Sequence, residues 1–366
     1  MHFPLILLFA LHAATASLPS ARDVIDRYVA ARGGREKMDA IHSLIYRGRY
    51  SEGSHVSDHA AMSLMRPYYK LVGDAEHPDP DFAEGYDGSA WEFYGDPGVV
   101  VRTVGAASSA GRHATDIDGP LVAALRNGWD VKLAGIEPVG DRRAYLLVIT
   151  MPDGFVQQEL VDTETSLLIA ERHAAPIHAF GEKVTSEERV GDYRDVDGVL
   201  FAFSHREVEI ATGRVLNEMQ WTSIVANTVS DAKVFSPPDW NRTPLQRFLD
   251  QLYAERADAD AVLWSYRDFK RTQPSIDTHD GIAFIGYQML KMGDVVPATK
   301  LLEANAADYP HAANAAFDLG RAYETASRTA DAIREYQRAL TIDPTYARAK
   351  AALERLPGHV RGSVRP

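Results

Sequence analysis

Apolar residues follow two different periods along this chain. Residues 20–34 have the helical period: Ser20 can cap the helix, an apolar stripe from Val24 to Val29 follows, and Gly33-Gly34 ends it. From Leu44 onward the apolar residues alternate with polar ones, which is typical of strands. The first half of the chain therefore predicts one helix followed by a long sheet.

The strand-like segments are separated by short turns. Met151-Pro152-Asp153-Gly154 and Asp162-Thr163-Glu164-Thr165 are spaced as the turns of an antiparallel meander. A second helix is predicted at 120–127. Such a sheet must bury its apolar face against helices or curl around a cavity. The predicted strands are 43–50, 61–72, 91–94, 98–104, 144–150, 155–161, 167–172, 199–208 and 215–226.

Near the C-terminus the period is helical again, and the sequence repeats itself. Residues that suit close helix packing and a terminal turn recur after 34 positions, which is the period of tetratricopeptide repeats. Segments 245–252 and 262–269 are also apolar at helical spacing but fall outside that register. The recurring residues are Gly286, Ala298 and Pro310, and then Gly320, Ala332 and Pro344.

These patterns divide the chain into five parts. We expect a signal peptide (1–16), a sheet domain (17–235), a proline-containing linker (236–242), a helical repeat domain (243–357) and a tail (358–366). The repeat domain comprises repeats 279–312 and 313–346 and a capping helix at 345–356. Because stacked repeats usually need about three units, 243–272 is interpreted as a degenerate repeat or an adapting hairpin.

The first residues have the features of a targeting segment. An apolar run, 3–11, leads to Ala14-Thr15-Ala16, which predicts cleavage after Ala16. No later stretch is apolar enough to predict a membrane-spanning helix. With no cysteine in 366 residues, the chain has neither a disulfide framework nor a lipid-modified cysteine. We therefore expect a periplasmic or secreted protein.

Charge and motifs exclude several classes of function. A net charge of −12 argues against nucleic acid as a partner. The motifs of serine hydrolases and of phosphate-binding loops are missing, so we expect no enzyme and no cofactor. His55 with His59, and His77 with Asp79 and Asp81, were weighed as metal ligands; solvated loop residues explain them better, and no metal site is expected.

Several motifs in the sheet domain resemble the outer-membrane lipoprotein-sorting family, the LolA-like proteins. The resemblance covers most of 20–235 and implies an unclosed, strongly curved antiparallel half-barrel, lidded by helices, with an apolar cavity for acyl chains. The fold class is thus α+β, with this half-barrel followed by an all-α repeat domain. The motifs are Tyr28-Val29-Ala30-Ala31-Arg32-Gly33-Gly34, Met65-Arg66-Pro67-Tyr68-Tyr69, Gly85-Tyr86-Asp87-Gly88 with Trp91, the segment 161–168, and the segment 192–199.

Two surfaces are candidate binding sites. The first is the cavity of the half-barrel, although ordinary core packing also explains its residues: Leu64, Tyr69, Trp91, Phe93, Phe201 and Trp221. The second is the groove formed by the first helix of each repeat, which alternatively docks on the sheet domain: Asp280, Tyr287, Lys291, Asn314, Arg321 and Glu324.

The sequence as a whole predicts an exported, non-catalytic binding protein. It carries a lipid or a lipoprotein acyl chain by apolar burial, and its repeats contact a protein. Two alternatives stay open. One is a structural interaction protein whose sheet core is filled by its own side chains; the other is an accessory subunit of an exported hydrolase.

Overall fold

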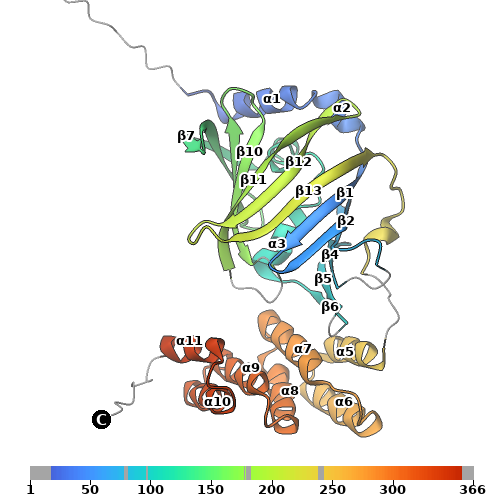
Figure 1. Ribbon diagram of the computed structural model, residues 1–366, viewed down its shortest axis with the longest axis vertical. Helices are drawn as coiled ribbons and strands as arrows, with labels where there is room; N and C mark the ends of the chain where they lie inside the picture. Colours follow the sequence, from blue (N-terminus) through green and yellow to red (C-terminus); the bar gives the residue numbers. More distant parts are fainter. Residues whose placement is uncertain are drawn as a thin grey trace, which may run out of the picture.

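The computed structural model describes residues 18–77, 81–95, 98–176, 178, 183–237 and 243–356. A curved sheet with helices forms one region, and a layer of helices forms the other (Figure 1). The predicted signal peptide and tail, and most of the predicted linker, lie outside the described residues. No helix among the described residues is long and apolar enough to cross a membrane.

The described strands form a single antiparallel sheet of 13 strands, in the order β6-β5-β4-β3-β2-β1-β13-β12-β11-β10-β9-β8-β7. Two meanders, β1–β6 and β7–β13, are joined where β1 pairs with β13. β6 and β7 stay as edges, so the curved sheet does not close, as the fold class predicted. The strands are β1 (Ser43–Glu52), β2 (His55–Met65), β3 (Tyr68–Val72), β4 (Phe82–Tyr86), β5 (Ala90–Tyr94), β6 (Val99–Arg102), β7 (Asp130–Val139), β8 (Arg142–Thr150), β9 (Val156–Asp162), β10 (Leu168–Pro176), β11 (Lys183–Val196), β12 (Val199–Glu209) and β13 (Val215–Ala226).

Helices cover the concave face of the sheet. α1 (Ala21–Ala31) and α2 (Arg35–Ala40) precede β1, while α3 (Gly105–His113) and α4 (Pro120–Asn127) connect the two meanders. α3 packs on β5 and β10, α4 packs on β8, and α1 contacts α4 and β7. The apolar stripe of α1 and the inner residues of the strands share one buried core. Ser20 caps α1 as predicted, forming a capping box with Asp23.

The second region consists of helices packed in antiparallel pairs after the short 3-10 helix η1 (Ala232–Phe235). Gly286 packs on Leu302, and Gly320 packs on Tyr336, so the same contact recurs 34 residues later. These glycines let paired helices approach closely, as the repeat predicted. The helices are α5 (Pro244–Glu255), α6 (Ala259–Thr272), α7 (His279–Met292), α8 (Val295–Asp308), α9 (Ala313–Thr325), α10 (Thr329–Ile342) and α11 (Ala347–Arg355).

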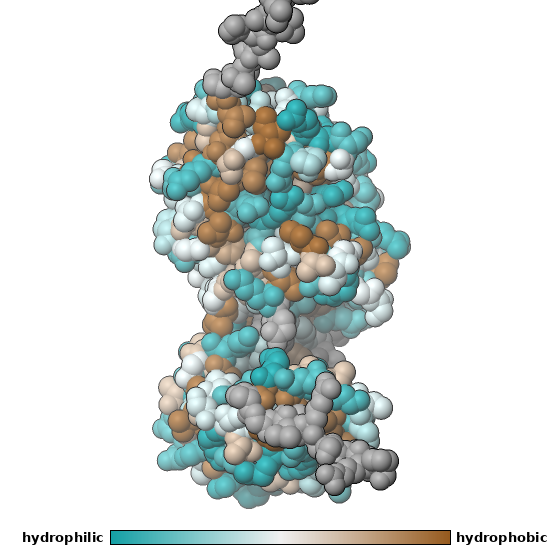
Figure 2. Space-filling model, turned by 90° about the vertical axis from the view of Figure 1, so that its left-hand side faces the viewer, coloured by the Kyte–Doolittle hydropathy of each residue, from teal (hydrophilic) through white to brown (hydrophobic). Residues whose placement is uncertain are grey.

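The helical region docks on the edge strand β6. α5 and α7 contact β6, and the buried Val101 of β6 belongs to the apolar core of the helices. The rings of Tyr94 (β5) and Phe284 (α7) lie 5.2 Å apart. Figure 2 shows apolar patches on the sheet region and a narrowing between the two regions. Because α5 and α7 cover β6, this edge is protected from pairing with another chain.

The sequence-based prediction was wrong for one strand and missed several elements. The predicted strand 61–72 is two strands, β2 and β3, because Pro67 in the turn lacks the N–H that a continuous ladder needs. The helices α2 and α3 and the strands β4, β7 and β11 were not predicted. α3 has no buried residue, and β7 contains Gly135 and Pro138, which is tolerated because β7 is an edge strand.

Candidate functional site

A cavity of about 540 Å³ opens at the mouth of the half-barrel, between α3 and α4. Its walls come from both meanders: the β2–β3 turn with the start of β3, and the end of β4 with the β4–β5 turn, belong to the first meander, and the turn between β8 and β9 belongs to the second. Its volume lies within the range of roughly 300–1,000 Å³ that is usual for small-molecule sites. The lining residues used below are Tyr68, Tyr86, Asp87, Arg112, His113, Asp116, Asn127, Trp129, Met151 and Asp153.

Large apolar and aromatic side chains form much of the cavity wall. Met151 is buried, and Tyr68, Tyr86 and Trp129 are half-buried, so each exposes part of its surface to the cavity. Trp129 follows α4, whose end is fixed by Gly128 in the left-handed conformation. This lining suits an apolar ligand.

An imidazole–carboxylate pair lies beside Trp129 in the cavity wall. His113 Nε2 lies 3.0 Å from Asp153 Oδ2, and the ring stacks on Phe155 and meets Trp129 edge to face. The pKa of Asp153 is lowered. Burial alone would raise it, but the Phe155 backbone N–H and the His113 ring stabilise the charged carboxylate and outweigh burial. The pair fastens α3 to the β8–β9 turn at the edge of the cavity.

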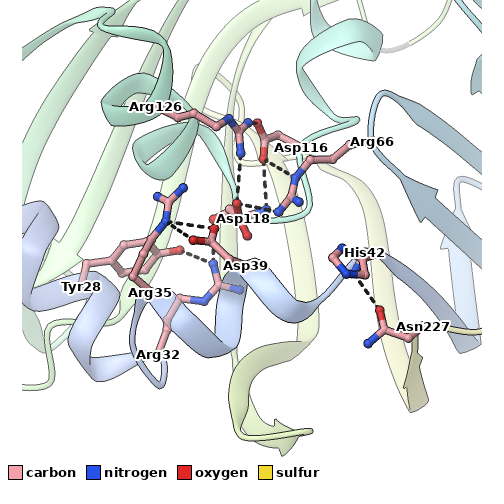
Figure 3. A network of polar contacts seen from close by, with 10 residues as sticks. All are labelled: Tyr28, Arg32, Arg35, Asp39, His42, Arg66, Asp116, Asp118, Arg126 and Asn227. Atoms are coloured by element: carbon pink, nitrogen blue, oxygen red, sulfur yellow. Dashed lines mark hydrogen bonds and ion pairs between the residues drawn. The ribbon is translucent and has the colours of Figure 1, made fainter.

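A network of ion pairs, which includes Asp116 of the cavity lining, fixes the α3–α4 connection (Figure 3). Asp118 accepts from Arg126 at 3.2 Å and pairs with Arg66 at 2.6 Å, while Asp116 pairs with both arginines. Burial raises the pKa of Asp118, and the Arg66 and Arg126 charges limit the rise. Strand β2 ends beside Arg66, so the network ties α4 to the first meander.

Arg32 anchors the same connection to the second meander. Its guanidinium donates to the carbonyls of Asp118 (2.8 Å) and Leu200 (3.1 Å) and to the Tyr28 hydroxyl (3.0 Å), and it lies over the Phe201 ring. Only 5% of Arg32 is exposed. The motif that carried the family resemblance, 28–34, therefore has a packing role here.

The charges around the cavity are balanced except at Arg112. Asp87 pairs with Arg102, Asp116 with Arg126, and Asp153 with His113. The exposed Arg112 side chain lines the cavity and forms no ion pair or hydrogen bond within the described part of the chain. The rim therefore offers a positive charge to a ligand.

The six residues predicted to line the cavity lie elsewhere. Leu64, Tyr69, Phe201 and Trp221 are packed in the main core, beneath the helices. Trp91 and Phe93 lie on the opposite face of the sheet in a small cluster with Ala83, where Trp91 donates to the Phe235 carbonyl at 3.0 Å. The structure does not bring the six together. The sequence of β5 shows that successive side chains point to opposite faces of the sheet. Only the pairing of β5 with its neighbours shows which of these faces meets the helices.

The six residues predicted for the repeat groove do lie on neighbouring helices, α7 and α9. Asn314 donates to Asp280 at 3.2 Å, and the Arg321 guanidinium lies 4.2 Å from the centre of the Tyr287 ring. Lys291 lies over the same ring, and Glu324 accepts from the Tyr336 hydroxyl. These side chains thus form contacts within and between neighbouring helices.

The sequence analysis missed a row of carboxylates on the helix-covered face of the sheet. Glu159, Glu171, Glu188 and Glu207 are direct cross-strand partners on β9, β10, β11 and β12. They share a face with Leu147, which pairs with Glu159 and belongs to the main core. The alternation of side chains along each strand could have placed each glutamate on the inner face. It could not have shown that the four strands pair so that the glutamates lie side by side.

Glu159 is the most constrained member of this carboxylate row. It is fully buried, and neither carboxylate oxygen has a hydrogen-bond partner in the described structure. Burial and the nearby Glu188 raise the pKa of Glu159 to about 8, and the Gln157 amide opposes that rise without reaching hydrogen-bond geometry. Glu188 is compensated by His205, 3.0 Å away.

The histidines weighed as metal ligands are separated in the structure. His59 is exposed and lies 3.3 Å from Glu76, whereas His55 is half-buried beside the Tyr50 ring. Asp79 lies outside the described residues, so the His77 set is not described as a whole.

No protein-family model and no curated protein matches the sequence. Three solved structures give low-scoring similarities, each covering 60% of this chain. A DUF1329 family protein from Desulfovibrio piger is 14% identical, with 98% of its chain covered and a TM-score of 0.36. A LolA superfamily protein from Nitrosomonas europaea is 11% identical, with 99% covered and a TM-score of 0.39. The MucA/MucB complex from Pseudomonas aeruginosa is 12% identical, with 61% covered and a TM-score of 0.18. The fold assignment therefore rests on the strand order described above.

Proposed function

We propose that this protein is a non-catalytic carrier that binds the single hydrocarbon chain of an amphipathic lipid or acylated molecule in the cavity between α3 and α4. The observation that carries the proposal is the composition of that cavity. Its volume of about 540 Å³ suits one chain, and Tyr68, Tyr86, Trp129 and Met151 offer an apolar surface. Burying the chain there supplies affinity at roughly 25 cal/mol per Å² before ordering costs.

The polar end of the ligand is expected to be anionic. The carboxylates that line the cavity are paired with basic side chains, whereas Arg112 at the rim is exposed and unpaired within the described residues. A carboxylate or phosphate at this rim gains a charge-assisted hydrogen bond from the guanidinium.

The helical region supplies a second surface, and we interpret 243–357 as a repeat module that contacts a protein. Arg321 and the exposed Lys291 both lie over the buried Tyr287 ring, and arginine is among the residues that protein interfaces favour. The module is held beside the cavity-bearing region through α5, α7 and β6. This arrangement suits a carrier that recognises the protein which gives or receives its ligand.

A direct test uses protein purified gently from its native envelope. Native mass spectrometry should show a co-purifying lipid or acylated molecule at one copy per chain. Calorimetry on delipidated protein should show binding of decanoate and weaker binding of decanol, because the two share a chain and differ in charge. No co-purifying lipid, together with no decanoate binding, would favour the alternative of a structural interaction protein with a filled core.

A further inference from the structure

One end of the half-barrel brings together side chains that are distant in sequence. Glu84 on β4, Glu92 on β5 and His178, between β10 and β11, place one potential ligand atom each within 4.8 Å of one another. Glu52, at the end of β1, holds the imidazole: its Oε1 lies 2.6 Å from His178 Nε2. Four separate elements thus converge on one point.

Each carboxylate of this group is oriented by a tyrosine. The Tyr69 hydroxyl donates to Glu84, and the Tyr94 hydroxyl donates to Glu92. Each hydroxyl engages one oxygen of its carboxylate. Outer hydrogen bonds of this kind fix the direction of ligating groups in metal sites. In the same way, Tyr50 donates to Glu52 at 2.5 Å.

The imidazole has an unused nitrogen at this position. His178 Nδ1 is buried and has no hydrogen-bond partner in the described structure, while Nε2 is engaged by Glu52. A carboxylate that holds one imidazole nitrogen while the other binds a metal is the usual arrangement around ligating histidines. Glu92 is only 4% exposed, so its carboxylate lies inside the protein. The unpaired His178 nitrogen is independent of the carboxylates and points to a cation.

We propose that Glu84, Glu92 and His178 bind one divalent cation, with Glu52 orienting the imidazole. Two carboxylates and an imidazole, in a chain without cysteine, suit Mn²⁺ or Zn²⁺ better than a thiolate-seeking ion. The ligands are separated by 8 and 86 residues and form no local motif, which explains why the sequence predicted no metal site.

The cation would tie His178 to β4 and β5. His178 already meets the Phe82 ring of β4 edge to face, with ring centres 5.0 Å apart. Tyr94 both orients Glu92 and packs on Phe284 of α7. The bound ion would therefore stabilise the end of the sheet that supports the helical region.

The test is equilibrium dialysis of the full chain, purified without a histidine tag, against Mn²⁺ or Zn²⁺. Wild-type protein should bind one ion per chain, and His178→Ala or Glu84→Gln should weaken binding at least tenfold. Glu52→Gln should weaken it by roughly 10- to 100-fold, as removal of an outer partner does elsewhere. The matched control is His59→Ala, which removes an exposed histidine that also has a carboxylate neighbour.

A second measurement does not depend on variants that could fail to fold. Pulsed electron paramagnetic resonance of Mn²⁺ bound to wild-type protein should show coupling to one imidazole nitrogen. The proposal is overturned if neither ion binds, if bound Mn²⁺ shows no nitrogen coupling, or if His59→Ala weakens binding as much as folded His178→Ala. These outcomes are independent of lipid binding, which calorimetry with decanoate reports.

Discussion

Gly320 of α9 lies directly against the ring of Tyr336 in α10: a β-carbon built on the glycine would come within 2.6 Å of the ring. The same relationship holds 34 residues earlier, where Gly286 faces Leu302 at 2.8 Å. An aromatic ring fixed in a core cannot give way as the end of a flexible side chain can.

Gly320→Ala should therefore destabilise the protein. Overpacking costs roughly 1–3 kcal/mol, whereas replacing glycine inside a helix gains at most about 1 kcal/mol. We expect a net loss of about 1 kcal/mol in the free energy of unfolding, measured by urea denaturation. Combining the change with Tyr336→Ala should remove the clash, so the two effects should not add. Full additivity would contradict the packing argument.

Arg32→Met should destabilise the sheet region far more than Arg35→Met. Arg32 is buried and donates three hydrogen bonds, and losing such bonds costs roughly 1.5–3 kcal/mol for a charged donor. Arg35 pairs with Asp39 on the surface, where an ion pair contributes about 0–1 kcal/mol. Urea denaturation should separate the two variants by about 2 kcal/mol. Equal losses would show that Arg32 does not anchor the α3–α4 connection.

The fold followed closely from the sequence because its signals are local. Ser20 with Asp23, the turn at Asp153-Gly154 and the glycines of the helical pairs each specify their surroundings within a few residues. The segments that were missed, such as β7 with Gly135 and Pro138, lack a local signal and are strands only because β8 pairs with them.

The sites could not be predicted from the sequence in the same way, because they depend on how the strands pair and on where the helices lie against the sheet. Trp91 and Tyr69 are both aromatic strand residues, yet the pairing of Tyr69 with Tyr86, and of Tyr86 with Ala90, puts Trp91 on the other face. The cavity depends on where α3 places His113 relative to Asp153, 40 residues away. No periodicity carries that information.

The buried carboxylate row should make stability fall as pH rises. The pKa of Glu159 is raised to about 8 from a usual value near 4.5, through burial and Glu188, so the native state holds a proton that the unfolded chain has lost. Binding of this proton stabilises the native state fully at low pH, and the stabilisation is lost as the pH rises to about 8. Between about pH 5 and 8, its contribution to the free energy of unfolding should fall by up to about 1.4 kcal/mol per pH unit.

Glu159→Gln keeps the shape of the neutral side chain and should remove this dependence. Urea denaturation from pH 5 to 9 should show a shallower decline for the variant and a higher stability at pH 9. Exposed Glu164→Gln, outside the carboxylate row, is the matched control. A wild-type slope retained in Glu159→Gln would mean that another group, such as neighbouring Glu171, carries the proton.

Asn127→Trp should block the cavity without disturbing the core. Asn127 is exposed at the end of α4 and lines the cavity, so an indole there occupies the space proposed for the hydrocarbon chain. Calorimetry should show decanoate binding weakened at least tenfold, while the free energy of unfolding stays within about 0.5 kcal/mol of wild type, as for other surface changes. Lys132→Trp, which adds the same indole to the exposed face of β7, should leave binding unchanged. Decanoate binding of wild-type strength in Asn127→Trp would place the ligand outside this cavity.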